Sequence, residues 1–278
     1  MIEKYYDGAI EQVAAGLGTV EKNYLLVRYS GQFSVENLND TKQLEKNEDI
    51  FVQVHEFETG EITCAYEPYL TMICDGFRRY MTGTFEEFME TCDVYYLHRP
   101  VLLGYFNQDN TGREEIILLD EVAYEQERML AALERMLCAI ADRHPVLFVL
   151  NRFQLASKST MQLTARFLKC ENCNIGLVLG VSDIQAMPEF LVPDWEMLYE
   201  TLDDGSKIYH IGNSGRKKEE TIDDEKYVDY GSEKVYRKLQ NMVEFLDFDQ
   251  AAYYLETIER KIKFDNLLVD EDRKSTRL

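Results

Sequence analysis

The sequence predicts an α/β fold in which helices cover a parallel β-sheet, followed by a C-terminal helical hairpin. Two continuous apolar runs, at 146–150 and 175–180, are typical of strands that are buried on both faces of a sheet. A stretch with helical periodicity lies between them. This alternation of strand, helix and strand predicts parallel pairing, because two parallel strands need a crossover connection between them.

The N-terminal quarter of the chain contains one helix and two strands by the same reasoning. Residues 3–16 predict a helix that ends at Gly16. The apolar run 23–30 has the length of a strand, and a short loop after it leads into a polar helix start at 35–46. Residues 49–57 alternate apolar and polar side chains, as a half-exposed strand does.

The middle of the chain is predominantly helical. Residues 66–80 predict a helix with Pro68 in its first turn, where a missing backbone N–H costs nothing. We expect short helices over 84–120. The helix at 121–141 has the clearest pattern, because apolar residues recur at steps of three and four and form one face. These residues are Met129, Leu133, Met136, Leu137 and Ile140.

The C-terminal part differs in composition from the segments before it. A short helix at 194–202 and a strand at 206–212 complete a first domain, which we assign to 1–212. Residues 213–231 are charged and nearly free of apolar side chains, which is typical of a linker. Residues 232–278 hold a helical hairpin that turns at 247–249, followed by a polar tail.

Composition excludes several classes of partner. The chain has 51 acidic and 30 basic residues, for a net charge of -21. Such a surface repels phosphate backbones and anionic lipids, so we expect no direct nucleic-acid or membrane binding. The N-terminus is polar, and no stretch approaches the roughly 20 apolar residues that span a bilayer. The six cysteines are scattered, which indicates reduced thiols in a cytoplasmic protein.

The stretch from 145 to 183 resembles the second and third core strands of the signalling ATPases of the AAA-like STAND group. Those proteins have an apolar strand, then D-D-x-Q-W-A-D, a helix, and a strand that ends in G-T-x-R. Here the residues after the first of these strands follow that pattern, and the segment 180–183 matches the later strand end. They are Phe153, Gln154, Leu155, Ala156 and Ser157. The resemblance covers 1–212 in order and implies a three-layer domain of the phosphate-loop (P-loop) NTPase type.

The phosphate loop of this template is altered. In an active P-loop ATPase, one strand leads into a glycine-rich loop whose Lys holds phosphates and whose Ser or Thr holds magnesium. Aligned on the first strand, the chain keeps Gly31 and Ser34. However, Val35 stands at the Lys position and Glu36 at the Ser/Thr position. Losing the Lys removes an attractive charge, and a Glu beside phosphates repels them.

Two further positions of the template differ as well. Asn151 and Arg152 replace the acidic pair that supports the metal and the attacking water, and Ser182 stands where the family often has an Arg. Two interpretations of Arg152 stay open, namely a partner for phosphate and a surface residue at a strand end. Together these seven positions form the candidate ligand site, a vestigial nucleotide pocket without catalytic residues or metal ligands. They are Gly31, Ser34, Val35, Glu36, Asn151, Arg152 and Ser182.

Two other patterns were weighed. The hairpin resembles a tetratricopeptide unit, with Ala251, Leu255 and Ile258 at four- and three-residue steps. One such unit cannot bury its face alone, so it either packs on the first domain or precedes further repeats. An ordinary hairpin that caps the domain is an equal alternative.

Cys170 and Cys173 form a CxxC motif. A zinc site would need a second pair of ligands, which the sequence lacks, and a redox motif would open a helix, whereas this one closes a helix. We therefore interpret the motif as incidental.

The resemblance implies a pseudo-ATPase, that is, a regulatory or sensory module of a larger bacterial signal-transduction protein that binds a protein or a ligand without turnover. No cofactor is expected. Its partner would be a protein or a C-terminal tetratricopeptide array with an output domain, such as a nucleotide cyclase or a DNA-binding helix-turn-helix. Two alternatives stay open. One is an ATP-binding STAND-type switch with magnesium and weak ATPase activity, and the other is a structural scaffold that forms a homodimer through the hairpin.

Overall fold

A computed structural model describes ten segments of the chain. They are 2–19, 23–30, 35, 48–58, 63–108, 121–170, 174–182, 187–203, 207–211 and 233–260. The predicted helix start after Val35, the loop at 109–120, the linker at 213–231 and the tail from 261 lie outside the described residues.

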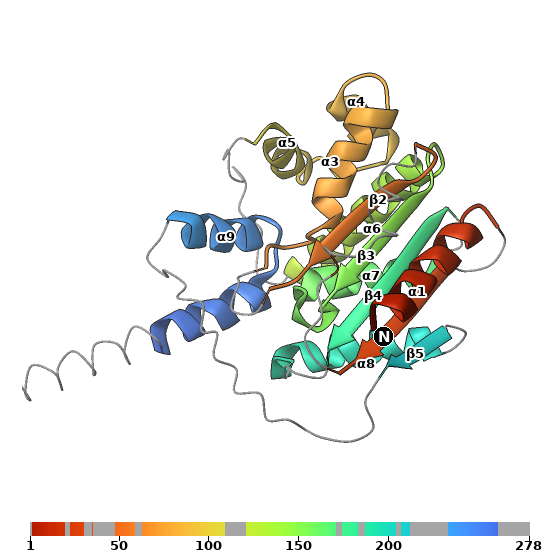
Figure 1. Ribbon diagram of the computed structural model, residues 1–278. Helices are drawn as coiled ribbons and strands as arrows, with labels where there is room; N and C mark the ends of the chain where they lie inside the picture. Colours follow the sequence, from red (N-terminus) through yellow and green to blue (C-terminus); the bar gives the residue numbers. More distant parts are fainter. Residues whose placement is uncertain are drawn as a thin grey trace, which may run out of the picture.

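Five strands form one sheet, in which all neighbouring strands are parallel (Figure 1). Their order across the sheet is β2-β3-β4-β1-β5. The strands are β1 (Asn23–Tyr29), β2 (Phe51–Glu56), β3 (Val146–Asn151), β4 (Ile175–Ser182) and β5 (Lys207–Ile211). The prediction of an α/β fold with a parallel sheet is therefore confirmed. All residues of β3 and β4 are buried, as their apolar runs indicated.

Helices cover both faces of the sheet, so the domain has three layers (Figure 1). Alternate residues of β3 show the division, because side chains of a strand point to opposite faces. Leu147 and Val149 pack with the apolar side of α1 (Ile2–Gly16). Phe148 and Leu150 pack in the larger core with α3, α6 and α7 on the other face.

In the described segments, six α-helices lie between β2 and β5 along the chain. Their bounds are α3 (Tyr69–Tyr80), α4 (Phe85–Thr91), α5 (Arg99–Asn107), α6 (Val122–Ala141), α7 (Lys158–Lys169) and α8 (Val192–Asp203). Helix α3 begins three residues later than predicted, because 65–68 form turns. The short helices predicted after residue 84 are present as α4 and α5. Helix α4 begins at Thr84 with a capping box, in which Thr84 and Glu87 satisfy each other's backbone N–H groups.

The C-terminal hairpin consists of α9 (Glu233–Glu244) and a second helix over 248–260. It has a small apolar core of its own, formed by Val235, Met242, Ala251 and Ile258. The hairpin also packs on the α/β part, beside the N-terminal end of α7 (Figure 1). No helix in the described part of the chain is long and apolar enough to cross a membrane.

Candidate functional site

The carboxyl ends of the parallel strands meet at one edge of the sheet, where α/β proteins generally bind ligands. Strand pairing sets which residues lie beside one another there. Tyr29 at the end of β1 is the register partner of Ser182 at the end of β4. Glu56 at the end of β2 is the register partner of Asn151 at the end of β3. The sheet thus brings four polar side chains to this edge.

The phenol of Tyr29 and the side-chain amide of Asn151 are hydrogen-bonded to each other at the centre of this edge. The Tyr29 hydroxyl donates a 2.7 Å hydrogen bond to Oδ1 of Asn151, which is fully buried. Above all because of burial, the pKa of Tyr29 is raised to about 12, although Arg152 acts in the lowering direction. The phenol therefore stays protonated at neutral pH and serves as a hydrogen-bond donor. It cannot act as a base there.

Helix α1 adds a second phenol to the same place. A Cβ atom added to Gly180 would lie 2.2 Å from the hydroxyl oxygen of Tyr6 and 2.6 Å from Oδ1 of Asn151. Burial, first of all, also raises the pKa of Tyr6. Only glycine leaves room for these two polar groups against β4. The space where β1, β3 and β4 end is therefore filled by side chains of the chain itself.

An ion pair fills the neighbouring position. The Arg152 guanidinium lies 3.2 Å from Oε1 of Glu56, and the backbone N–H of Val35 donates a 3.2 Å hydrogen bond to Oε2 of the same carboxylate. Arg152 is in the left-handed region, with φ of 53°, which directs the chain away from β3 into the turn before α7. The carboxylate of Glu56 thus receives a cationic group and an amide hydrogen, the kinds of donor that hold phosphate in other sites.

The structure brings together four of the seven predicted site residues. Val35, which the sequence comparison aligned with a phosphate-binding Lys, is 1% exposed and packs in the core on the α1 side of the sheet. Arg152 directly follows β3, is partly exposed and pairs with Glu56, so both interpretations, as a partner for phosphate and as a surface residue at a strand end, stay predictions. The backbone N–H of Ser182 donates to Oε1 of Gln154 at 3.3 Å. Gly31, Ser34 and Glu36 lie outside the described residues.

Three participants were missed from the sequence. Glu56 ends a predicted strand, and a polar residue at such an end is a signal that could have been used. Nothing in the sequence connects Tyr29 to Asn151 or brings Tyr6 to Gly180, because these contacts depend on the strand order and on how α1 packs on the sheet. Tyr29 and Glu56 are partners of predicted residues, and they satisfy polar groups of those residues.

The chemistry available at this edge is limited. Among the described residues at this edge, the carboxylate of Glu56 is already paired, and the two phenols are held protonated. No group of three or more metal-binding side chains occurs in the described segments. The described residues therefore suit a packed polar cluster that holds the strand ends together.

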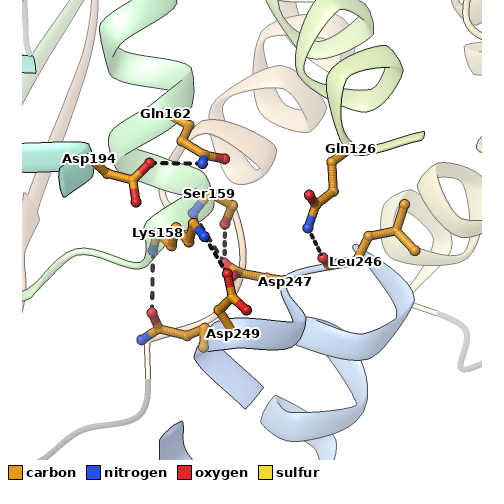
Figure 2. Close-up of polar contacts among 9 residues, drawn as sticks. Gln126, Lys158, Ser159, Gln162, Asp194, Leu246, Asp247 and Asp249 are labelled. Atoms are coloured by element: carbon orange, nitrogen blue, oxygen red, sulfur yellow. Dashed lines mark hydrogen bonds and ion pairs between the residues drawn. The ribbon is translucent and has the colours of Figure 1, made fainter. Parts of the chain in front are cut away.

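A second polar cluster joins the hairpin to the start of α7 (Figure 2). Three backbone N–H groups at this helix start each donate to a side chain. The backbone N–H of Thr160 donates to the Ser157 hydroxyl at 3.2 Å, and the backbone N–H of Ser159 donates to the Asp247 carboxylate at 3.2 Å. The backbone N–H of Lys158 donates to Oε1 of Gln250 at 3.3 Å. Two of the three acceptors thus come from the hairpin, so docking caps the helix.

Asp247 is the central residue of this hairpin junction. It is 3% exposed, and its Oδ2 also accepts a 2.5 Å hydrogen bond from the Ser159 hydroxyl. Burial raises the pKa of the Asp247 carboxyl, while the hydrogen bonds from Ser159 oppose this. The positive end of the α7 dipole lies at the same place and favours a negative charge.

Further contacts extend the hairpin junction over α6 and the segment before α3. Gln126 of α6 donates from its amide to the backbone carbonyl of Leu246 (Figure 2). The backbone N–H of Ala65 donates to Oδ1 of Asn241 at 3.1 Å. The ring of Phe245 lies edge-on to Tyr66, with 6.0 Å between the ring centroids. The hairpin is thus tied to three separate parts of the α/β domain.

Comparison with models of known protein families gives no match, and comparison with curated proteins gives none either.

Proposed function

We propose that this chain is a non-catalytic regulatory module, built on an ATPase-like sheet, that belongs to a larger bacterial signalling protein and acts by binding a protein. The observation that carries the proposal is the carboxylate of Glu56. It accepts the amide hydrogen of Val35 and pairs with Arg152, so an internal anion holds the donors that a bound phosphate would need.

The strand order supports the likeness to phosphate-loop ATPases. The template requires the loop after the first strand to lie near the end of the strand that carries the acidic residue. In this sheet only β4 separates β1 from β3, and the hydrogen bond from Tyr29 to Asn151 spans that gap. The site has the right position for nucleotide chemistry, and an amide replaces its acid.

A protein partner is favoured by exposed apolar side chains of the hairpin. Three large ones, Tyr236, Val243 and Leu255, are 68%, 47% and 51% exposed. Large exposed apolar surfaces are typical of contacts with another protein. These three side chains stay exposed although the hairpin is docked on the α/β part.

Calorimetric titration with inorganic phosphate tests the role of Glu56. Glu56→Ala would free the Val35 N–H and the Arg152 guanidinium, so we expect it to bind phosphate at least about tenfold more tightly than the unchanged chain, or about 1.4 kcal/mol. The matched control is Glu58→Ala, which removes an equal charge from an exposed position two residues away. Saturable phosphate binding by the unchanged chain, or equal binding by both variants, would show that Glu56 does not occupy an anion position.

A further inference from the structure

Two cysteine sulfur atoms lie in contact between α6 and α7. Cys138 belongs to α6, and Cys170 is the residue that ends α7. Their Sγ atoms are 3.6 Å apart, and both thiols are free. The sequence interpretation considered Cys170 only together with Cys173, so it missed this contact, which depends on the packing of two helices.

The contact is close enough for a covalent bond to form with little movement. A disulfide needs about 2.05 Å between its sulfur atoms, so the two Sγ atoms, now 3.6 Å apart, have to approach each other by only about 1.5 Å. Both cysteines are also half-buried, so a small reagent in solvent reaches them. Cys74 and Cys92, by contrast, are buried in the core.

We propose that Cys138 and Cys170 form a redox-active dithiol, which a low-molecular-weight disulfide such as glutathione disulfide converts into a disulfide that joins α6 to the end of α7. This inference is independent of whether the strand ends bind nucleotide. It assigns a modification site to a cysteine that the CxxC pattern alone left without a role.

The reaction proceeds by two thiol–disulfide exchanges. The Cys170 thiolate attacks one sulfur of glutathione disulfide and releases one glutathione thiolate, which leaves a mixed disulfide on Cys170. Cys138 then loses its proton, attacks the Cys170 sulfur and expels the second glutathione. The protein loses two protons and two electrons, and the reagent gains them as two thiols.

The environment of the Cys138 thiol indicates that Cys170 attacks first. Burial is the main reason why the pKa of the Cys138 thiol is raised, and the nearby carboxylates of Glu134 and Asp142 act in the same direction. A thiol with a raised pKa makes a poor first nucleophile, since the thiolate is the reactive form. Cys138 is therefore the thiol that resolves the mixed disulfide, and Cys170 is the one that forms it.

The crosslink would act on the platform that holds the hairpin. Helix α6 contacts the hairpin through Gln126, and α7 contacts it through its first residues. Joining α6 to the far end of α7 fixes these two helices relative to each other and encloses β3. It constrains the unfolded chain, so the oxidised form should melt at a higher temperature than the reduced form.

The test uses the reduced full chain, equilibrated with an excess of glutathione disulfide, then quenched with acid, alkylated and digested. We expect mass spectrometry to find the peptides of Cys138 and Cys170 linked, about 2 Da lighter than their sum. Cys173→Ser should retain this product, while Cys138→Ser and Cys170→Ser should each lose it. Circular dichroism checks that the variants fold.

Two results would overturn the proposal. The first is a Cys170 that pairs with Cys173, or that carries only glutathione while Cys138 is alkylated. The second is an oxidised chain that melts at the same temperature as the reduced chain. If a Cys138 or Cys170 variant fails to fold, the disulfide-linked peptides of the unchanged chain and of Cys173→Ser still show which cysteine pairs with Cys170.

Discussion

The hairpin junction offers a sharp test because its buried anion can be removed alone. Asp247→Ala takes away the acceptor of two hydrogen bonds, from the backbone N–H and the hydroxyl of Ser159. Hydrogen bonds to a charged acceptor contribute about 1.5 to 3 kcal/mol each. Burial of the charge, which raises the pKa of this carboxyl, offsets part of that gain. We therefore expect a net loss of about 2 kcal/mol in the free energy of unfolding.

Two measurements follow this loss. Thermal unfolding should shift downward by roughly 4 to 8 °C, at about 2 to 4 °C per kcal/mol for a chain of this size. Amide hydrogen exchange should become faster over 233–260 and at the first residues of α7, because both sides of the hairpin junction are released. The β3 strand should keep its protection against local opening.

Asp249 is the matched control, since it lies two residues away, at the start of the second hairpin helix, and forms an ion pair with Lys158. Its side chain is 61% exposed, so Asp249→Ala should cost no more than about 1 kcal/mol. Equal effects of the two variants, or an Asp247→Ala variant with unchanged exchange over 233–260, would refute the inference that Asp247 holds the hairpin.

Three further substitutions test the packing at the strand ends and at the hairpin junction. Gly180→Ala places a methyl group against Tyr6 and Asn151 and should cost about 1 to 3 kcal/mol or more by overpacking, measured by urea unfolding. Tyr29→Phe removes the donor to Asn151 and should cost about 1 kcal/mol in the same assay, whereas no change would exclude a stabilising hydrogen bond. The raised pKa of Asp247 means that its contribution to stability is largest at acid pH and falls as the pH rises through the folded-state pKa. Asp247→Asn keeps an acceptor without the charge, so its stability should lack this fall, and an unchanged pH profile would contradict the assignment.

The apolar patterns were sufficient to predict the sheet. The run at 146–150 is buried on both faces, whereas the strand predicted at 49–57 lies at the edge, where apolar and polar residues after Phe51 are partly exposed alike. The helix after 151 was predicted without a start, and Ser157, a good N-cap residue directly before α7, is the signal that could have located it. Such features depend on neighbouring residues in the sequence, so a local pattern can reveal them.

Long-range pairing could not be predicted in the same way. Asn151 and Arg152 were recognised as departures from an acidic pair, but their partners Tyr29 and Glu56 lie on other strands. The hairpin turn was predicted at 247–249, and the structure has it at 245–247. The contact of Asp247 with Ser159 depends on where the hairpin docks. The alternation of apolar and polar residues along a strand shows which side chains share a face. Only the order of the strands in the sheet shows which strand ends lie side by side.

Calorimetric titration of the reduced full chain with Mg²⁺ and ATP, with phosphate release followed in the same samples, tests most directly whether this domain uses nucleotide. We predict no saturable binding and no phosphate release above the buffer control, because Val35, which we align with the lysine of a phosphate loop, is buried and Glu56 holds the nearby donors. Micromolar binding accompanied by phosphate release would contradict the assignment of a non-catalytic module.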